Sequence, residues 1–71
     1  MKLHHKTLHT LNNRLRELMY GYNITIGRYV YWVNTVTGGV YRMTVDDLRF
    51  GRINGELCAR VTDDWISVVN F

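Results

Sequence analysis

The sequence predicts an α+β fold, with one N-terminal amphipathic helix followed by a four- or five-stranded antiparallel meander. The main observation is a change in the spacing of apolar residues near Gly21. Before it, leucines recur every three or four residues, which places them on one face of a helix. After it, apolar residues fall on every second position. Two glycine turn signals follow, at Gly38-Gly39 and Asn54-Gly55.

The predicted helix covers residues 6–20. Its buried stripe is expected to consist of Leu8, Leu11, Leu15, Leu18 and Met19. The polar residues Asn12, Asn13, Arg16 and Glu17 lie largely away from that stripe. Gly21 then occupies a C-cap position, where a positive φ carries no steric penalty.

The first strand is expected over residues 23–36, with a bulge or bend at Gly27, and the second over residues 40–45. A turn centred on Gly38-Gly39 would pair Val36 with Tyr41. One face of this hairpin, the expected core, would carry Val30, Trp32, Val36, Tyr41, Met43 and Val45. The other would carry Thr25, Tyr29, Tyr31, Val33, Val40 and Arg42.

A second hairpin is predicted from residues 48–53 and 56–61, joined by the Asn54-Gly55 turn, and a last strand over residues 65–71. Its register places Phe50 opposite Ala59, which brings apolar side chains to one face. An alternative exists for residues 44–51. Thr44, with Asp47 three residues later, also fits the cap of a short helical turn ending at Gly51. We favour a strand from Leu48 onward.

These elements form one domain over residues 1–71, either an open sheet or a small SH3-like barrel. The order of elements is also similar to that of Sm-like RNA-binding proteins. The chain lacks the Asp and Asn expected downstream of Gly39-Val40-Tyr41-Arg42, and the later Arg-Gly or Lys-Gly pair. The residues therefore assign no family.

Composition favours a folded chain, with 46% hydrophobic residues and a formal charge of +3. The one cysteine forms no internal disulfide, so nothing indicates an oxidising compartment and a cytoplasmic protein is expected. No secretory leader is recognisable. The longest apolar run, residues 29–33, is far shorter than the ~20 residues that span a bilayer, so no membrane association is expected.

No motif indicates catalysis, so we expect a protein that is not an enzyme and uses no cofactor. His5 and His9 have helical spacing, but two imidazoles do not make a zinc site and no metal is expected. The carboxylate pairs at Asp46-Asp47 and Asp63-Asp64 fit turns and caps better than acid-base chemistry. Cys58 has no partner histidine at a recognisable spacing and is expected to be a buried thiol.

The remaining function is binding. In the predicted second hairpin Arg49 lies opposite Arg60, an arrangement of like charges that an anion would relieve. The first hypothesis is a nucleic-acid or polyanion module, single-stranded or RNA, in which arginines hold phosphates and tyrosines stack. Its expected binding residues are Tyr29, Tyr31, Val33, Arg42, Arg49, Arg52 and Arg60, with Tyr41 as a further ring.

The alternative is a protein-binding adaptor or inhibitor, such as a phage or mobile-element accessory protein. It would dock on an acidic protein surface through the apolar, aromatic face that carries Tyr29, Tyr31 and Val33. One helix covers only one face of the sheet, so a homodimer is a further expectation.

Overall fold

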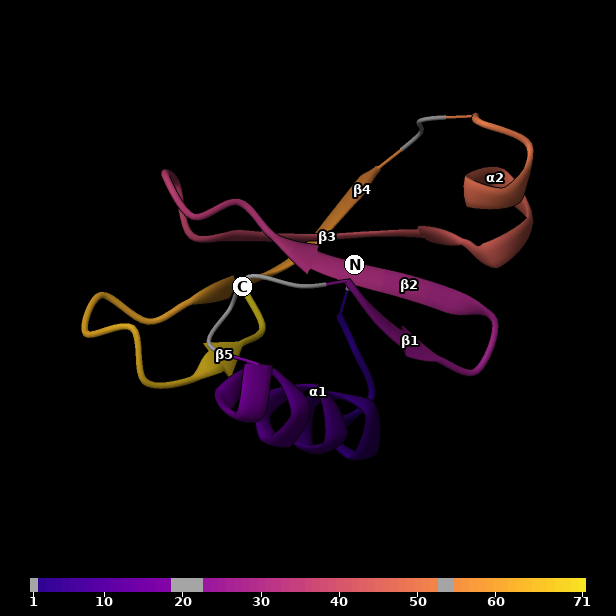
Figure 1. Ribbon diagram of the computed structural model, residues 1–71. Coiled ribbons are helices and arrows are strands. Elements are labelled where there is room, and N and C mark those ends of the chain that lie inside the picture. The colour runs from indigo at the N-terminus through magenta and orange to yellow at the C-terminus, as the bar shows by residue number, and fades with distance from the viewer. Residues whose placement is uncertain (1, 19–22, 53–54) are drawn as a thin grey trace.

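The computed structural model describes residues 2–18, 23–52 and 55–71. An N-terminal helix packs on a curled, five-stranded antiparallel sheet, which confirms the predicted fold class. The elements are α1 (His5–Leu18), β1 (Ile24–Ile26), β2 (Tyr29–Val33), β3 (Gly39–Thr44), α2 (Val45–Arg49), β4 (Glu56–Val61) and β5 (Val68–Val69). The strands lie side by side in chain order. Figure 1 shows α1 on one side of the sheet and α2 on the other.

The main core lies between α1 and the sheet. Leu11 and Leu15, from the predicted stripe, are fully buried. Their helix begins at His5, one residue before the predicted start, and is described as far as Leu18; the rest of the predicted helix and the C-cap expected at Gly21 lie outside the described residues. The buried core consists of Leu3, Leu11, Leu15, Ile24, Tyr31, Val40, Cys58, Ala59, Val61 and Val68.

Two asparagine side chains join the N-terminal part of the chain to the C-terminal strand. Asn12 on α1 donates from Nδ2 to the carbonyl of Val68 (2.9 Å) and accepts through Oδ1 from the Val68 amide (2.6 Å). Asn70 binds the backbone of Leu3 in the same reciprocal way, at 2.9 and 3.0 Å. Asn12 thus satisfies backbone groups of the edge strand β5, and Asn70 satisfies those of Leu3 in the segment before α1.

The predicted strand over residues 23–36 is wrong, because the chain reverses at Gly27-Arg28. Ile26 pairs with Tyr29, so Gly27 and Arg28 form the tight turn of a β1–β2 hairpin. Gly27 has a φ of +61°, the left-handed conformation that such a turn requires and that glycine adopts without strain.

This turn also reverses the predicted faces of the sheet. Ile24 lies opposite Tyr31, so the inward residues of β1 share a face with the odd-numbered residues of β2. Tyr31 and Val40 therefore lie under α1, where they are 2% and 0% exposed. The expected core face, with Trp32 and Tyr41, is the side of the sheet away from α1.

The second turn is longer than predicted. Val33 pairs with Val40, and residues 34–38 form the loop in place of a turn centred on Gly38-Gly39. Asn34 explains the early start, because its Oδ1 accepts from the amides of Val36 and Thr37 at 2.9 and 3.2 Å. The register shift is even, so residues predicted to share a face on β2 and β3 still do.

The predicted strand over residues 48–53 is also wrong, and the alternative of a short helical turn is correct. Thr44 caps α2, because its hydroxyl accepts from the amide of Asp47 at 3.0 Å. The strand that pairs with β4 is β3, so Phe50 does not face Ala59 and Arg49 does not face Arg60. The Asn54-Gly55 turn falls partly outside the described residues.

A β-bulge lies where β3 pairs with β4. The register shifts between Val40 and Tyr41, and Cys58 and Ala59 are both fully buried as a result. The last predicted strand is shorter, Val68–Val69 in place of residues 65–71. It is preceded by a loop in which Trp65 has a φ of +58° and the Asp64 carboxylate accepts from the Thr62 hydroxyl and the Ile66 amide.

Candidate functional site

The side of the sheet away from α1 is the candidate binding surface, and we call it the outer face. Successive side chains of a strand point to opposite faces, so the residues next to core residues in the sequence lie on the outer face. These are Thr25, Val30, Trp32, Tyr41, Met43, Leu57 and Arg60. In Figure 1, α2 lies over one end of this face, near the Thr44 end of β3. Val30 and Met43 are buried, at 3% and 6% exposed, so part of the outer face is covered.

Two stacked rings lie in the middle of the outer face. Trp32 and Tyr41 are directly opposed on β2 and β3, and their ring centroids are 5.8 Å apart with an interplanar angle of 21°. The segment that leads into β4 packs against this pair. A Cβ on Gly55 would lie 2.7 Å from Cζ2 of Trp32, so only glycine allows the backbone this close. Both rings remain half-buried.

A hollow of about 270 Å³ lies on each side of the ring pair. One is lined by the residue before β1, by residues of β2 and β3 and by the α2 leucine: Asn23, Val30, Trp32, Met43 and Leu48. The other, toward β4, is lined by Thr37, Gly39, Tyr41, Leu57, Arg60 and Phe71. Leu48, Leu57 and Phe71 are 43%, 42% and 60% exposed, so both hollows have accessible apolar walls.

The charge around the two hollows comes from one described side chain. Among the described side chains that line the two hollows, that of Arg60 is the one with a formal charge, and it is exposed. The arrangement can therefore accept two apolar side chains and pair one carboxylate with a guanidinium.

The structure does not bring the sequence-predicted site residues together. Tyr29, Tyr31, Val33 and Arg42 share the α1 side of the sheet, where Tyr31 is buried. Arg49 is at the end of α2 and Arg52 follows it, and both are exposed. Of the predicted set, Arg60 is the residue that lies on the outer face.

Arg42 is held by its neighbours on the α1 side. Its guanidinium lies 4.0 Å from the centroid of the Tyr29 ring, and Nη2 is 3.9 Å from Oε2 of Glu56. Burial opposes its charge, but a hydrogen bond with Tyr31 and the nearby Tyr29 and Glu56 outweigh that effect and raise the pKa of Arg42. The side chain is 14% exposed, so it is a positioned internal cation.

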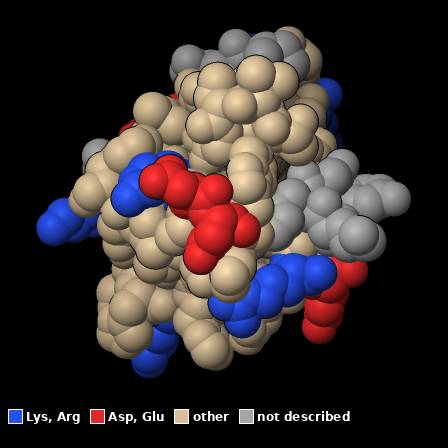
Figure 2. Space-filling model, turned by 90° about the vertical axis from the view of Figure 1, so that its left-hand side faces the viewer, with Lys and Arg blue, Asp and Glu red and all other residues tan. Residues whose placement is uncertain are grey.

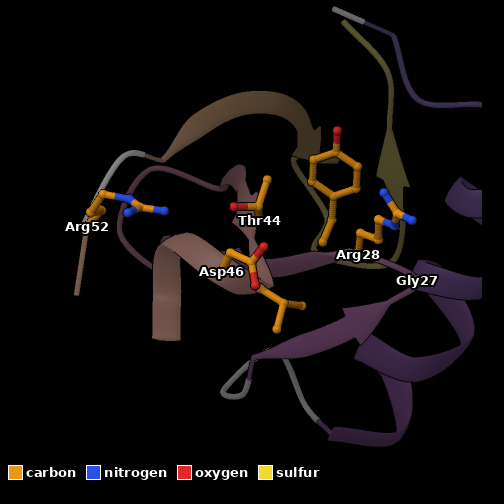
Figure 3. Close-up of a pocket in the computed structure, with 7 residues that line it drawn as sticks. Gly27, Arg28, Thr44, Asp46 and Arg52 are labelled. Atoms are coloured by element: carbon orange, nitrogen blue, oxygen red, sulfur yellow. The ribbon is translucent and has the colours of Figure 1, made fainter. Parts of the chain in front are cut away.

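Arg52 is engaged in an ion pair. Its Nε lies 2.9 Å from Oδ1 of Asp47, and this hydrogen bond, together with that from Thr44, lowers the pKa of Asp47. Arg52 also borders a cleft of about 640 Å³ between α2 and the β1–β2 turn, which Thr44 and Asp46 line as well. Figure 3 shows Asp46 and Thr44 in the middle of that cleft, with Arg52 and Arg28 at opposite ends.

The surface at the left of Figure 1, which includes the β2–β3 loop, is shown in Figure 2. Acidic side chains gather near the middle of this view, and the coloured basic side chains lie apart from one another around them. On this face the described basic residues do not form the continuous stripe typical of a surface that follows a nucleic-acid backbone.

Cys58 is the one cysteine of the sequence, and it is buried. Burial raises the pKa of Cys58 to about 11, and its thiol lies 3.3 Å from the carbonyl of Val40, so it stays protonated near neutral pH. Within residues 2–18, 23–52 and 55–71, no three His, Cys, Asp or Glu side chains gather as metal ligands would. In that same part of the chain no helix has the length and apolar character to cross a bilayer.

Sequence reasoning missed the importance of Trp32, which was assigned to the core, and of Leu48 and Leu57. The missing signal was the Gly27-Arg28 turn, because it decides which side of β2 faces α1. A comparison with known proteins finds no matching family and no significantly similar curated protein or solved structure.

Proposed function

We propose that this protein is a non-catalytic binding module that docks a partner protein through its outer face. The observation that carries the proposal is the half-buried Trp32–Tyr41 ring pair between two apolar hollows. Partly exposed tryptophan and tyrosine beside an arginine make up the residue types that dominate binding energy in protein interfaces.

The charge of the outer face favours one kind of partner. Arg60 stands at the rim of the hollow formed by Tyr41 and Leu57. An apolar side chain of the partner would fill that hollow while a neighbouring Asp or Glu pairs with Arg60. A second copy of this chain fits less well, because the described side chains that line the two hollows include no Asp or Glu for Arg60. The homodimer stays a prediction from the sequence.

Nucleic acid has a weaker basis on this sheet. The stacking role requires accessible tyrosines, and Tyr31 is 2% exposed. The arginines expected to hold phosphates lie on different sides of the molecule. Arg42 contacts Tyr29 and Glu56, and Arg52 pairs with Asp47.

The test is selection of ligands from a random peptide library displayed on phage. We expect the enriched peptides to carry an apolar residue close to Asp or Glu. Leu57→Arg, which places a charge in the hollow, should weaken the synthesised peptides at least tenfold, or about 1.4 kcal/mol. Fluorescence anisotropy measures the affinity. The matched control is Ile66→Arg, since Ile66 is 58% exposed and lines neither hollow.

Three results would contradict the proposal. They are a library without enriched peptides, equal weakening by Ile66→Arg, and a parent dimer that Leu57→Arg dissociates in sedimentation velocity. The last would assign the outer face to a second copy. Stronger binding of basic peptides than acidic ones by the Arg60→Glu variant would support the role of Arg60.

A further inference from the structure

A second cleft lies on the α1 side of the sheet, between the start of α1 and the β1–β2 turn. Its volume is about 410 Å³. We call it the basic cleft. Its lining comes from the segment before α1, the first turn of α1, the turn and the adjoining strands: Lys2, Leu3, His4, Thr7, Ile26, Gly27, Arg28, Tyr29, Tyr31 and Arg42.

The charge of the basic cleft has one sign. Lys2, Arg28 and Arg42 carry formal positive charges, and none of the described residues that line it is acidic. The carboxylate of Glu56, which does not line the cleft, lies 3.9 Å from Nη2 of Arg42. The larger neighbouring cleft differs in this respect, because Asp46 lies in its middle (Figure 3).

The N-terminus of α1 adds to this positive potential. A helix of this length carries a partial positive charge at that end, and one of its first amides, that of Lys6, donates to Nδ1 of His4 at 3.2 Å. Acidic residues in the first turn commonly offset this charge, but the first turn of α1 has none. Thr7, in that turn, lines the cleft with its side chain half-buried.

Arg42 is fixed in the floor of the cleft before any ligand arrives. The Tyr29 ring, the Tyr31 hydrogen bond and Glu56 hold its guanidinium in place. A ligand therefore needs to order only the exposed side chains of Lys2 and Arg28 at the rim, which lowers the entropic cost of binding.

We propose that the basic cleft binds a phosphoryl group. The cleft is lined by donors from separate elements: the guanidinium groups of Arg28 and Arg42, the ammonium of Lys2, the hydroxyl of Thr7 and the start of α1. Such a set suits a tetrahedral anion with several oxygens. The group could come from free phosphate or a mononucleotide, or from a nucleic-acid backbone. This inference is independent of protein docking, because the basic cleft and the outer face lie on opposite sides of the sheet.

The first experiment is an NMR titration of the parent with inorganic phosphate. We expect the amide signals of Thr7 and Arg28 to shift and saturate. Arg28→Gln removes one charge-assisted contact and should weaken phosphate at least tenfold. The matched control is Arg49→Gln, which removes the same charge from an exposed position on α2 that does not line the cleft.

A second variant separates binding from folding. Thr7→Glu places a carboxylate in the first turn of α1, where it favours the helix dipole, and also in the basic cleft. We expect its melting temperature to equal or exceed that of the parent while phosphate binding is lost. Retained phosphate binding in Thr7→Glu would contradict the proposal.

The source of the phosphoryl group is tested with a random-sequence single-stranded oligonucleotide. Binding tighter than phosphate, weakened by Arg28→Gln and by salt, would identify a nucleic-acid backbone. Affinity no greater than that for phosphate would identify free phosphate or a mononucleotide. The proposal is overturned if phosphate shifts neither amide signal, or if Arg49→Gln weakens it as much as Arg28→Gln.

Discussion

At the scale of single residues, Gly55 controls the position of the ring pair. A Cβ at this position would lie 2.7 and 2.8 Å from two atoms of the Trp32 ring. Gly55→Ala should therefore displace the indole and destabilise the fold by about 1–3 kcal/mol, the usual cost of overpacking. Urea unfolding measures the change, and tryptophan fluorescence reports the displacement.

A double-mutant cycle supplies the control for Gly55. Trp32→Leu removes the ring atoms that the new methyl group would meet. In that background Gly55→Ala should cost less than half as much as in the parent. An equal cost in both backgrounds would show that the penalty arises from the backbone of Gly55.

At the scale of elements, α2 depends on its N-cap. The Thr44 hydroxyl accepts from the amide of Asp47, and α2 is only five residues long, so it has few other local interactions. Thr44→Ala should lower the free energy of unfolding by about 1 kcal/mol. Thr44→Ser keeps the acceptor oxygen and should stay close to the parent in the same chemical denaturation measurement. Equal loss in both variants would assign the effect to the threonine methyl group.

The element scale also shows what sequence patterns could predict. The helical stripe was recognisable because Leu11 and Leu15 follow a long periodic run, and both are buried. The β2 and β3 residues were sorted correctly into two faces, since alternation is a local property.

The choice of which face is covered could not be made from that alternation. It depended on a two-residue Gly27-Arg28 turn, which lacks the Asn-Gly or Asp-Gly signature of a strong hairpin. Missing it exchanged Tyr31 for Trp32 as the accessible aromatic residue. The cap at Thr44 was visible in the sequence, but the apolar match of Phe50 with Ala59 outweighed it.

At the scale of the whole molecule, the ionisation of two carboxylates makes the stability of the fold depend on pH. Hydrogen bonds from Arg52 and Thr44 lower the pKa of Asp47, and those from Thr62 and the Ile66 amide lower the pKa of Asp64. A lowered pKa in the folded state contributes stability above the ordinary Asp value, and this contribution is lost as pH falls through the folded value.

We therefore expect the melting temperature, followed by circular dichroism, to fall as the pH drops below about 4. Asp64→Asn should show a smaller fall than the parent over the same range. Asp63→Asn is the matched control, because it removes a neighbouring carboxylate from the same loop. A fall of equal size in the parent and in Asp64→Asn would contradict the role of Asp64.

The reciprocal amide contacts of Asn12 and Asn70 have a consequence for biosynthesis. Residues 2–18 are made before residues 68–70. The Asn12 side chain nevertheless binds the backbone of Val68, and the backbone of Leu3 binds the side chain of Asn70. Until residues 68–70 have been made, α1 can pack on β1 but has no β5 to pack on, so part of its buried surface lacks its cover. Complete docking of α1 is thus a late event, and the nascent chain carries some open hydrophobic surface until this segment has been translated.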